Sequence, residues 1–179
     1  MKTLALLALV TAGFLAVQDP EPTAPTKHHA WLQQLVGEWD VTSEATMVPG
    51  QAPMRTEGTA SVRSLNGVWI LAEGTASFGG MPFTSMMTLG YDPRKKAYVG
   101  TWVDTLQTHL WTYVGQLDDS GRQLTLDTEG PGFNNPSKMA RYRDAFEVKG
   151  PDHLELSSSV QNSEGTWNTF MRAQYRRRK

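Results

Sequence analysis

Residues 82–104 read PFTSMMTLGYDPRKKAYVGTWVD, and this stretch decides the fold. Two runs rich in β-branched and aromatic residues flank Asp92-Pro93, a dipeptide typical of tight turns. With Pro93 at the second position of a four-residue turn inside Tyr91–Lys96, the runs pair as antiparallel strands. The expected partners are Leu89–Tyr98, Met87–Gly100, Ser85–Trp102 and Phe83–Asp104. This face is the more aromatic one, so we expect it to point inward and to carry the Asp104 carboxylate with it.

The same alternation of strand-like runs and turn residues continues in both directions. Dipeptides such as Pro49-Gly50, Asn66-Gly67 and Gly79-Gly80 separate the runs. The sequence therefore predicts an all-β fold, a single antiparallel meander β-barrel of about ten strands, with a two-sheet sandwich as the alternative. The predicted strands are Glu38–Met47, Thr56–Leu65, Val68–Phe78, Pro82–Tyr91, Ala97–Asp104, Thr108–Leu117, Arg122–Thr128, Lys138–Val148, His153–Val160 and Thr166–Tyr175.

The hairpin around Asn66-Gly67 allows a test of register. A three-residue loop over residues 65–67, with Gly67 in the left-handed conformation, separates apolar from polar side chains. The expected cross-strand partners are then Val62–Ile70, Ala60–Ala72 and Gly58–Gly74.

The N-terminal part of the chain is organised differently. Residues 1–18, MKTLALLALVTAGFLAVQ, place Lys2 before an uncharged apolar run from Leu4 to Ala16. This is the layout of a secretory signal peptide, and the run is too short to span a bilayer. The sequence predicts an exported protein, periplasmic or secreted, with cleavage after Ala12 or Ala16 both open and no integral membrane span after cleavage.

A linker and one short helix are expected between the leader and the first strand. Residues 19–26, DPEPTAPT, are Pro-rich and predict a disordered linker. In residues 27–36 the side chains of Trp31, Leu32 and Leu35 share one helical face, and Gly37 ends the helix. The barrel domain is therefore placed at residues 27–179.

Composition limits the classes of function. The absence of cysteine excludes disulfides, thiolate metal sites and cysteine nucleophiles. The formal net charge of −1 gives no overall field that would attract nucleic acid or an anionic membrane. We expect no nucleic-acid partner, and we interpret the basic residues 176–179 as a solvated end.

Short motifs in five places agree in order and spacing with one family. They are LVGEW at 35–39, GYD at 90–92, YVGTWVD at 98–104, Arg143 before AFEV at 145–148, and Asp152-His153. In these residues the chain resembles the bacterial family called "domain of unknown function 1579", over roughly Trp31 to Arg177. The resemblance implies a lipocalin-like β-barrel and no established activity.

Gly37-x-Trp39 also resembles the opening signature of lipocalins and related calycin barrels. In those folds the tryptophan lies at the closed end of the barrel, against an arginine near the last strand. The resemblance implies a structural role for Trp39, with Arg172 and Arg176 as candidate cation–π partners.

Asp104 and His109 are the candidates for chemistry at the barrel mouth. An inward Asp104 could bind a polar ligand head or act as a general base, or it could cap the loop that follows its strand. With a loop over 105–108, His109 lies opposite Asp104 and Trp111 opposite Trp102. With a loop shorter by one residue, His109 points outward, and the sequence leaves both registers open.

Arg143 lies in the middle of a predicted strand. Tyr142 and Phe146 share one face and Arg141, Arg143 and Glu147 the other, so periodicity places Arg143 outside the barrel. The family resemblance marks the same position. A buried arginine that holds a ligand carboxylate is therefore the alternative interpretation.

Metal and cofactor patterns are missing from the sequence. His28 and His29 lie on different helical faces, His153 stands alone in a turn, and no His-x-x-x-His spacing occurs. Phosphate loops, Rossmann glycines, EF-hand loops and the Gly-x-Ser-x-Gly elbow are absent as well. We expect no metal, no cofactor and no assigned catalytic residue.

The leading interpretation is an exported barrel that binds a small, mostly apolar ligand. Two alternatives remain: an enzyme that uses an Asp104–His109 pair at the mouth, and a structural envelope module with a filled barrel. Cavity size distinguishes the filled barrel from the other two. The expected ligand-binding residues are Phe83, Met87, Tyr98, Trp102, Asp104, His109, Trp111 and Arg143.

Overall fold

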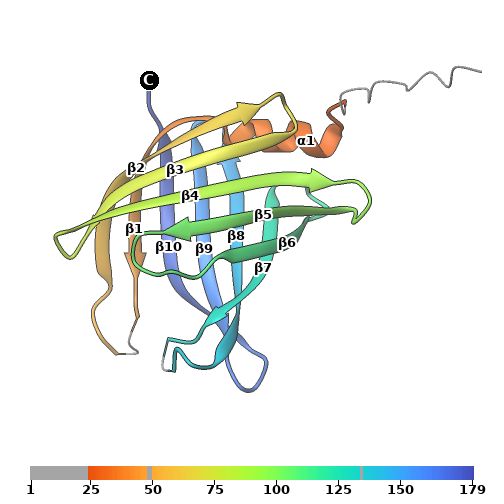
Figure 1. The fold of residues 1–179 in the computed structure, drawn as a ribbon. Coiled ribbons are helices and arrows are strands. Elements are labelled where there is room, and N and C mark those ends of the chain that lie inside the picture. Colours follow the sequence, from red (N-terminus) through yellow and green to blue (C-terminus); the bar gives the residue numbers. More distant parts are fainter. Residues whose placement is uncertain (1–23, 48–49, 134) are drawn as a thin grey trace, which may run out of the picture.

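A closed antiparallel barrel forms the body of the molecule (Figure 1). The computed structural model describes residues 24–47, 50–133 and 135–179, so the predicted leader lies outside the described residues. Each strand pairs with the next in sequence, and β1 closes the barrel against β10. The predicted meander barrel is confirmed and the sandwich alternative is wrong. The strands are β1 Gly37–Ala45, β2 Met54–Leu65, β3 Trp69–Phe78, β4 Met81–Asp92, β5 Ala97–Asp104, β6 Trp111–Leu117, β7 Gln123–Pro131, β8 Met139–Gly150, β9 His153–Gln161 and β10 Trp167–Arg177.

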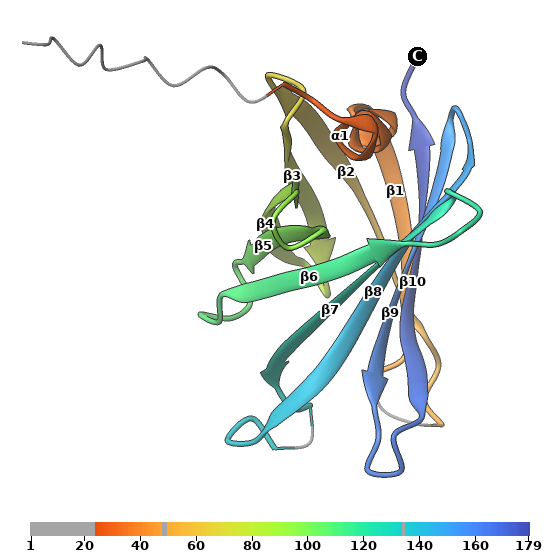
Figure 2. The same cartoon turned by 90° about the vertical axis from the view of Figure 1, so that its right-hand side faces the viewer.

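One short helical segment closes one end of this barrel. The helix α1 (Lys27–Leu32) continues into the 3₁₀ turn η1 (Gln33–Leu35), so the predicted helix is confirmed but tightens in its last turn. The segment lies across the upper end of the barrel in both views (Figure 1, Figure 2). The connections β1–β2, β3–β4, β5–β6, β7–β8 and β9–β10 lie at the opposite end, toward the left and bottom of Figure 1, and we call this end the mouth.

Hydrogen bonds from α1 fix it to the closed end. His29 is fully buried; its Nδ1 accepts the Thr26 N–H at 2.9 Å and its Nε2 donates to the carbonyl oxygen of Tyr91 at 3.1 Å. The Trp31 indole donates to the carbonyl oxygen of Gly121 at 2.8 Å. Because one acceptor lies near the end of β4 and the other in the β6–β7 connection, α1 ties separate parts of the closed end together. No helix in the described part of the chain has the length and apolarity needed to cross a membrane.

Trp39 lies at this closed end, fully buried, and its indole donates to the carbonyl oxygen of Leu35 at 2.9 Å. Its cation–π partner is Arg177, 4.1 Å from the ring centroid, so the expectation of Arg172 or Arg176 is wrong. Arg177 is the direct partner of Trp39 across the β1–β10 pair, and directly opposed side chains share one face of a sheet. Gly37 makes room for the arginine, because a Cβ there would lie 2.1 Å from its Nη1.

The registers of two hairpins differ from the prediction by two residues. In β4–β5, Ser85 pairs with Asp104 and Met87 with Trp102, because Asp92 stays in the strand and Lys96 takes a positive φ of 51°. In β2–β3, Val62 pairs with Ala72 and Ala60 with Gly74. There Asn66 and Gly67 both have positive φ, so the loop is residues 66–68. A shift of two residues keeps each side chain on its predicted face, so the inward face of β4–β5 was predicted correctly, and Val62 and Ala60 still share one face with Ala72 and Gly74.

Candidate functional site

The barrel interior holds three adjoining chambers in the described part of the chain. The indole of Trp102 lines all three of them. The small-residue chamber has a volume of about 200 Å³, the aromatic chamber about 220 Å³ and the closed-end chamber about 60 Å³. The barrel is therefore hollow around Trp102.

Small side chains on β2 and β3 create the small-residue chamber. Gly58 and Ala60 on β2 face Gly74 and Ala76 on β3, which removes side-chain volume from one wall. Larger apolar and aromatic groups complete the lining, namely Phe78, Phe83, Leu106, Leu156, Met171 and Tyr175. None of the described residues that line this chamber is charged, so it suits an apolar group.

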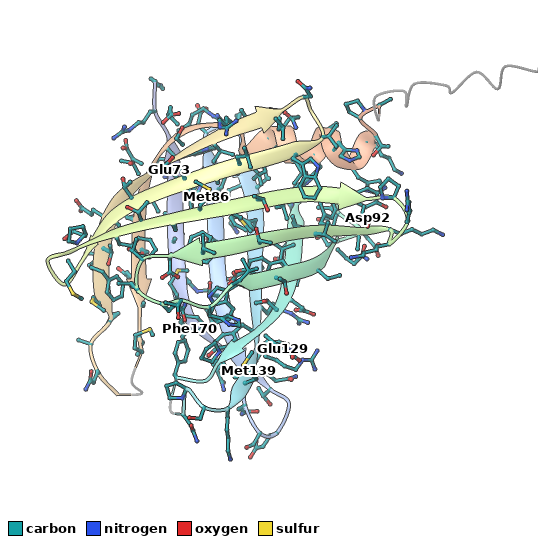
Figure 3. All side chains as sticks on the ribbon, in the orientation of Figure 1. Glu73, Met86, Asp92, Glu129, Met139 and Phe170 are labelled. Carbon is teal, nitrogen blue, oxygen red and sulfur yellow. The ribbon has the colours of Figure 1, made fainter. Side chains whose placement is uncertain are left out.

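Aromatic rings in edge-to-face contact surround the aromatic chamber. The ring centroids of Trp111 and Tyr142 lie 5.0 Å apart, those of Tyr142 and Phe133 5.4 Å, and those of Phe133 and Phe170 4.8 Å. Phe170 is the extra residue of a β-bulge, since Thr169 pairs with Ser159 but Met171 with Ser158. It lies toward the mouth in Figure 3.

A glycine positions the Trp111 ring on this wall. A Cβ at Gly130 would lie 2.2 Å from Cζ3 of Trp111, so the indole lies directly against the β7 backbone. Glycine at this position therefore sets the depth of the ring and with it the width of the chamber.

A carboxylate with two hydroxyl partners lies inside the aromatic chamber. Tyr113 donates a hydrogen bond from its hydroxyl to Oδ2 of Asp144 at 2.7 Å, and the hydroxyl of Ser158 is a second partner. Burial raises the pKa of the Asp144 carboxyl, and the hydrogen bonds of Ser158 and Tyr113 act in the opposite direction. Burial, followed by the Asp144 charge, raises the pKa of Tyr175 to about 12. Asp144 keeps some accessible surface because it faces the cavity.

Thr128 adds an unpaired hydroxyl to the same chamber. Its side chain is 7% exposed and its Oγ1 has no hydrogen-bond partner among the described residues. It lies opposite Tyr142 on the β7–β8 pair, two positions from the Leu126–Asp144 pair. Buried hydroxyls are normally hydrogen-bonded, so Thr128 has donor and acceptor capacity that this chain does not use.

Charges around the chambers have one sign. Asp104 and Asp144 line the aromatic chamber, while lysine, arginine and histidine are absent from the described residues that line the three chambers. The cavity is therefore apolar with an acidic end.

Comparison with known proteins gives the family of this barrel. Residues 24–177 match the family model described as "Protein of unknown function (DUF1579)". The chain belongs to this DUF1579 family. No curated protein matches the sequence.

Solved structures resemble the DUF1579 chain in fold. Rv2717c from M. tuberculosis aligns with a TM-score of 0.63 at 12% identity, over 87% of this chain and 100% of that one. The S-type phycobiliprotein lyase CPES from Guillardia theta aligns with a TM-score of 0.55 at 10% identity, over 87% and 99%. At such identities the likeness is one of fold alone.

Most of the predicted binding residues of this DUF1579 barrel line its chambers, and three do not. The lining set is Phe83, Met87, Trp102, Asp104 and Trp111. Tyr98 instead packs under α1, where its hydroxyl donates to the carbonyl oxygen of His28 at 3.1 Å. Burial and the neighbouring Tyr91 raise the pKa of Tyr98 to about 12.

Asp104 caps the loop after β5. Its Oδ1 accepts the N–H groups of Leu106 at 2.8 Å and Gln107 at 3.2 Å, and its Oδ2 accepts the Trp102 indole N–H at 3.1 Å. Of the roles considered for Asp104, the structure of the DUF1579 chain thus shows the cap of the loop.

His109 lies on the rim of the mouth. Trp111 pairs with Trp102, as in the register with the longer loop, but β6 begins at Trp111 and leaves His109 outside the ladder. The Nε2 of His109 donates to the carbonyl oxygen of Glu129 at 3.1 Å, and its ring packs against Trp111. Asp104 and His109 therefore bond to separate partners.

Arg143 lies on the outer face of the barrel, as its periodicity predicts. It forms a two-pronged ion pair with Asp127, at 2.7 and 3.0 Å, and its guanidinium lies 4.2 Å from the ring centroid of Trp167. The guanidinium thus joins β7, β8 and β10 from outside, and Arg143 is not part of the chamber linings.

Asp144, Tyr113, Ser158 and Thr128 were not among the predicted binding residues. The alternation that placed Tyr142 and Phe146 inside also places Asp144 inside, because it lies between them at even spacing. That signal was present, whereas the meeting of Tyr113 and Ser158 with Asp144 depends on barrel closure. Residues suited to a metal ion do not cluster anywhere in the described ranges.

Proposed function

We propose that this DUF1579 protein is exported and binds a small, mostly apolar molecule inside its barrel. The observation that carries the proposal is the pair of chambers around Trp102, of about 200 and 220 Å³. An apolar protein cavity of about 150 Å³ is large enough to bind benzene, so each chamber accommodates a ring system or a short alkyl chain. The chambers argue against a barrel packed solid with side chains.

The geometry gives less support to an enzyme. An acid–base pair at the mouth needs Asp104 and His109 within hydrogen-bond reach of each other. Each of them is instead engaged with the loop or strand beside it. A binding function therefore accounts better for the interior.

Support for export comes from the sequence of residues 1–18, with one basic residue, an apolar run and a polar end. Expression in a bacterium with two membranes, followed by fractionation and intact-mass measurement, tests this part. We expect a periplasmic or secreted protein whose mass lacks the leader. A cytoplasmic protein of full mass would overturn the export proposal.

Titration with N-phenyl-1-naphthylamine tests the binding proposal. This neutral probe has two ring systems, one for each chamber, and its fluorescence rises in apolar surroundings. We expect saturable binding that Ala76→Phe weakens at least about tenfold, because Ala76 lines the small-residue chamber. The matched control is Ser77→Phe, on the exposed face of the same strand, which should bind normally. Absence of saturable binding to the unaltered protein would overturn the proposal.

Native mass spectrometry of protein purified from its exporting host adds the identity of the occupant. A stoichiometric mass difference from the denatured protein would support the proposal and give the mass of the ligand.

A further inference from the structure

The acidic end of the cavity has features that the apolar part does not explain. Asp144 carries a carboxylate into the barrel, but the hydroxyls of Tyr113 and Ser158 are neutral donors and supply no countercharge. A buried carboxylate is costly unless it is paired with a positive charge. Because no basic residue lines the described chambers, the chain itself supplies no countercharge for an ionised Asp144, and a cationic group of a ligand would supply it.

Unused hydrogen-bonding capacity lies next to this carboxylate. An ionised carboxylate accepts about four hydrogen bonds, and Asp144 has the two partners Tyr113 and Ser158. The unpaired Oγ1 of Thr128 lies on the same wall, two positions along the β7–β8 pair. A ligand group with several N–H donors would satisfy both residues.

Aromatic rings complete the surroundings that an organic cation prefers. Trp102, Trp111, Tyr142 and Phe146 line the aromatic chamber together with Asp144. Faces of aromatic rings attract ammonium groups, more strongly where water is excluded. The second carboxylate, Asp104, adds to the negative potential at the mouth side of the chamber.

From these observations we infer that the ligand carries a protonated amine, held in the aromatic chamber by Asp144 and Thr128, with its apolar body in the small-residue chamber. The inference rests on the proposed function, because it names the chemistry of a ligand in the same barrel. It also separates this barrel from carriers of fatty acids, since the carboxylate of such a ligand would meet two acidic residues and no base.

Three compounds with one skeleton provide the test: 4-phenylbutylamine, 4-phenylbutanol and 4-phenylbutyrate. Each is titrated calorimetrically into the protein at neutral pH and used to displace N-phenyl-1-naphthylamine. We expect the amine to bind at least about tenfold more tightly than the alcohol, and the carboxylate to bind more weakly than the alcohol. Equal affinities, or tightest binding of the carboxylate, would overturn the inference.

Variants assign the preference to its residues. Asp144→Asn should abolish the advantage of the amine and leave the affinity for the alcohol within about twofold. The matched control is Asp127→Asn, which removes the same charge from the outer face and should keep the preference. Thr128→Val should weaken the amine by roughly fivefold, the effect of one hydrogen bond. An amine preference that persists in Asp144→Asn would overturn the inference.

The two proposals fail in different ways. If N-phenyl-1-naphthylamine binds but the amine has no advantage over the alcohol, the inference fails and the apolar binding function stands. If neither the probe nor any of the three compounds binds, both fail. The comparison within the unaltered protein does not depend on whether any variant folds.

Discussion

The guanidinium of Arg177 lies 4.1 Å from the ring centroid of Trp39, which it faces directly across the β1–β10 pair that closes the barrel. The same guanidinium donates to the carbonyl oxygens of Val36 at 2.7 Å, Gln34 at 3.1 Å and Pro151 at 3.0 Å. One side chain near the C-terminus therefore joins the first strand, the 3₁₀ turn and the β8–β9 connection.

Replacement of Trp39 by alanine should destabilise the fold strongly. The indole is fully buried and donates to the carbonyl oxygen of Leu35, so its removal leaves a cavity and an unpaired acceptor. We expect a loss of about 3–5 kcal/mol in the free energy of unfolding, the usual range for a large buried aromatic residue. Denaturant unfolding followed by circular dichroism measures it. An unchanged unfolding midpoint would mean that Trp39 is not a structural plug.

Arg177→Lys should cost stability although it keeps the positive charge. A lysine ammonium lacks the planar fork that reaches three carbonyl oxygens at once. We expect a loss of about 1–3 kcal/mol from carbonyl groups left without a donor. Arg176→Lys is the control, because Arg176 is exposed and should change the unfolding free energy by less than about 0.5 kcal/mol. Equal effects of the two variants would contradict the assigned role of Arg177.

The fold could be predicted because its determinants are local. Alternation within each strand, together with turn residues such as Asn66-Gly67, fixes which face of a strand points inward. The register of a strand pair is harder to predict than its inward face, since it depends on the backbone geometry of the connecting loop. Lys96 at a φ of 51° is an example that residue type does not suggest. The partner of Trp39 was missed for the same reason, because the β1–β10 register decides it.

The candidate site was predicted in part. Residues of one hairpin, such as Met87 and Trp102, were placed correctly because their shared face follows from alternation. The group around Asp144 joins β6, β8 and β9, and only the three-dimensional arrangement of these strands brings Tyr113 and Ser158 together with it. Asp104 illustrates the opposite case, since its place at a strand end already favoured the capping role that it has.

Gly130→Ala should disturb the aromatic chamber. The new Cβ would lie 2.2 Å from Cζ3 of Trp111, so the ring has to move. We expect a loss of about 1–3 kcal/mol in stability, typical of overpacking, and weaker binding of N-phenyl-1-naphthylamine. Gly150→Ala is the matched control, because a Cβ there meets nothing within 4 Å. Normal probe binding by Gly130→Ala would contradict the assignment of Trp111 to the chamber wall.

The pH dependence of stability should carry a contribution from Asp144. The groups that face it are Tyr113 on β6, Ser158 on β9 and Tyr175 on β10, with Asp104 on β5 acting on Tyr113. None of them is basic, so burial dominates and the folded protein binds the Asp144 proton to higher pH than the unfolded chain does. Below the ordinary aspartate pKa of 3.8 this contribution is fully present.

As the pH rises from 3.8 through the raised pKa of Asp144, that contribution of Asp144 to the free energy of unfolding is lost. The asparagine of Asp144→Asn cannot ionise. The free energy of unfolding of the unaltered protein, minus that of this variant, should therefore decrease over that pH interval. Denaturant unfolding at a series of pH values measures the difference. The comparison is needed because the pKa values of Asp118 and Glu155 are lowered and act in the opposite sense in both proteins. A difference that is constant with pH would mean that Asp144 ionises in the barrel as it does in water.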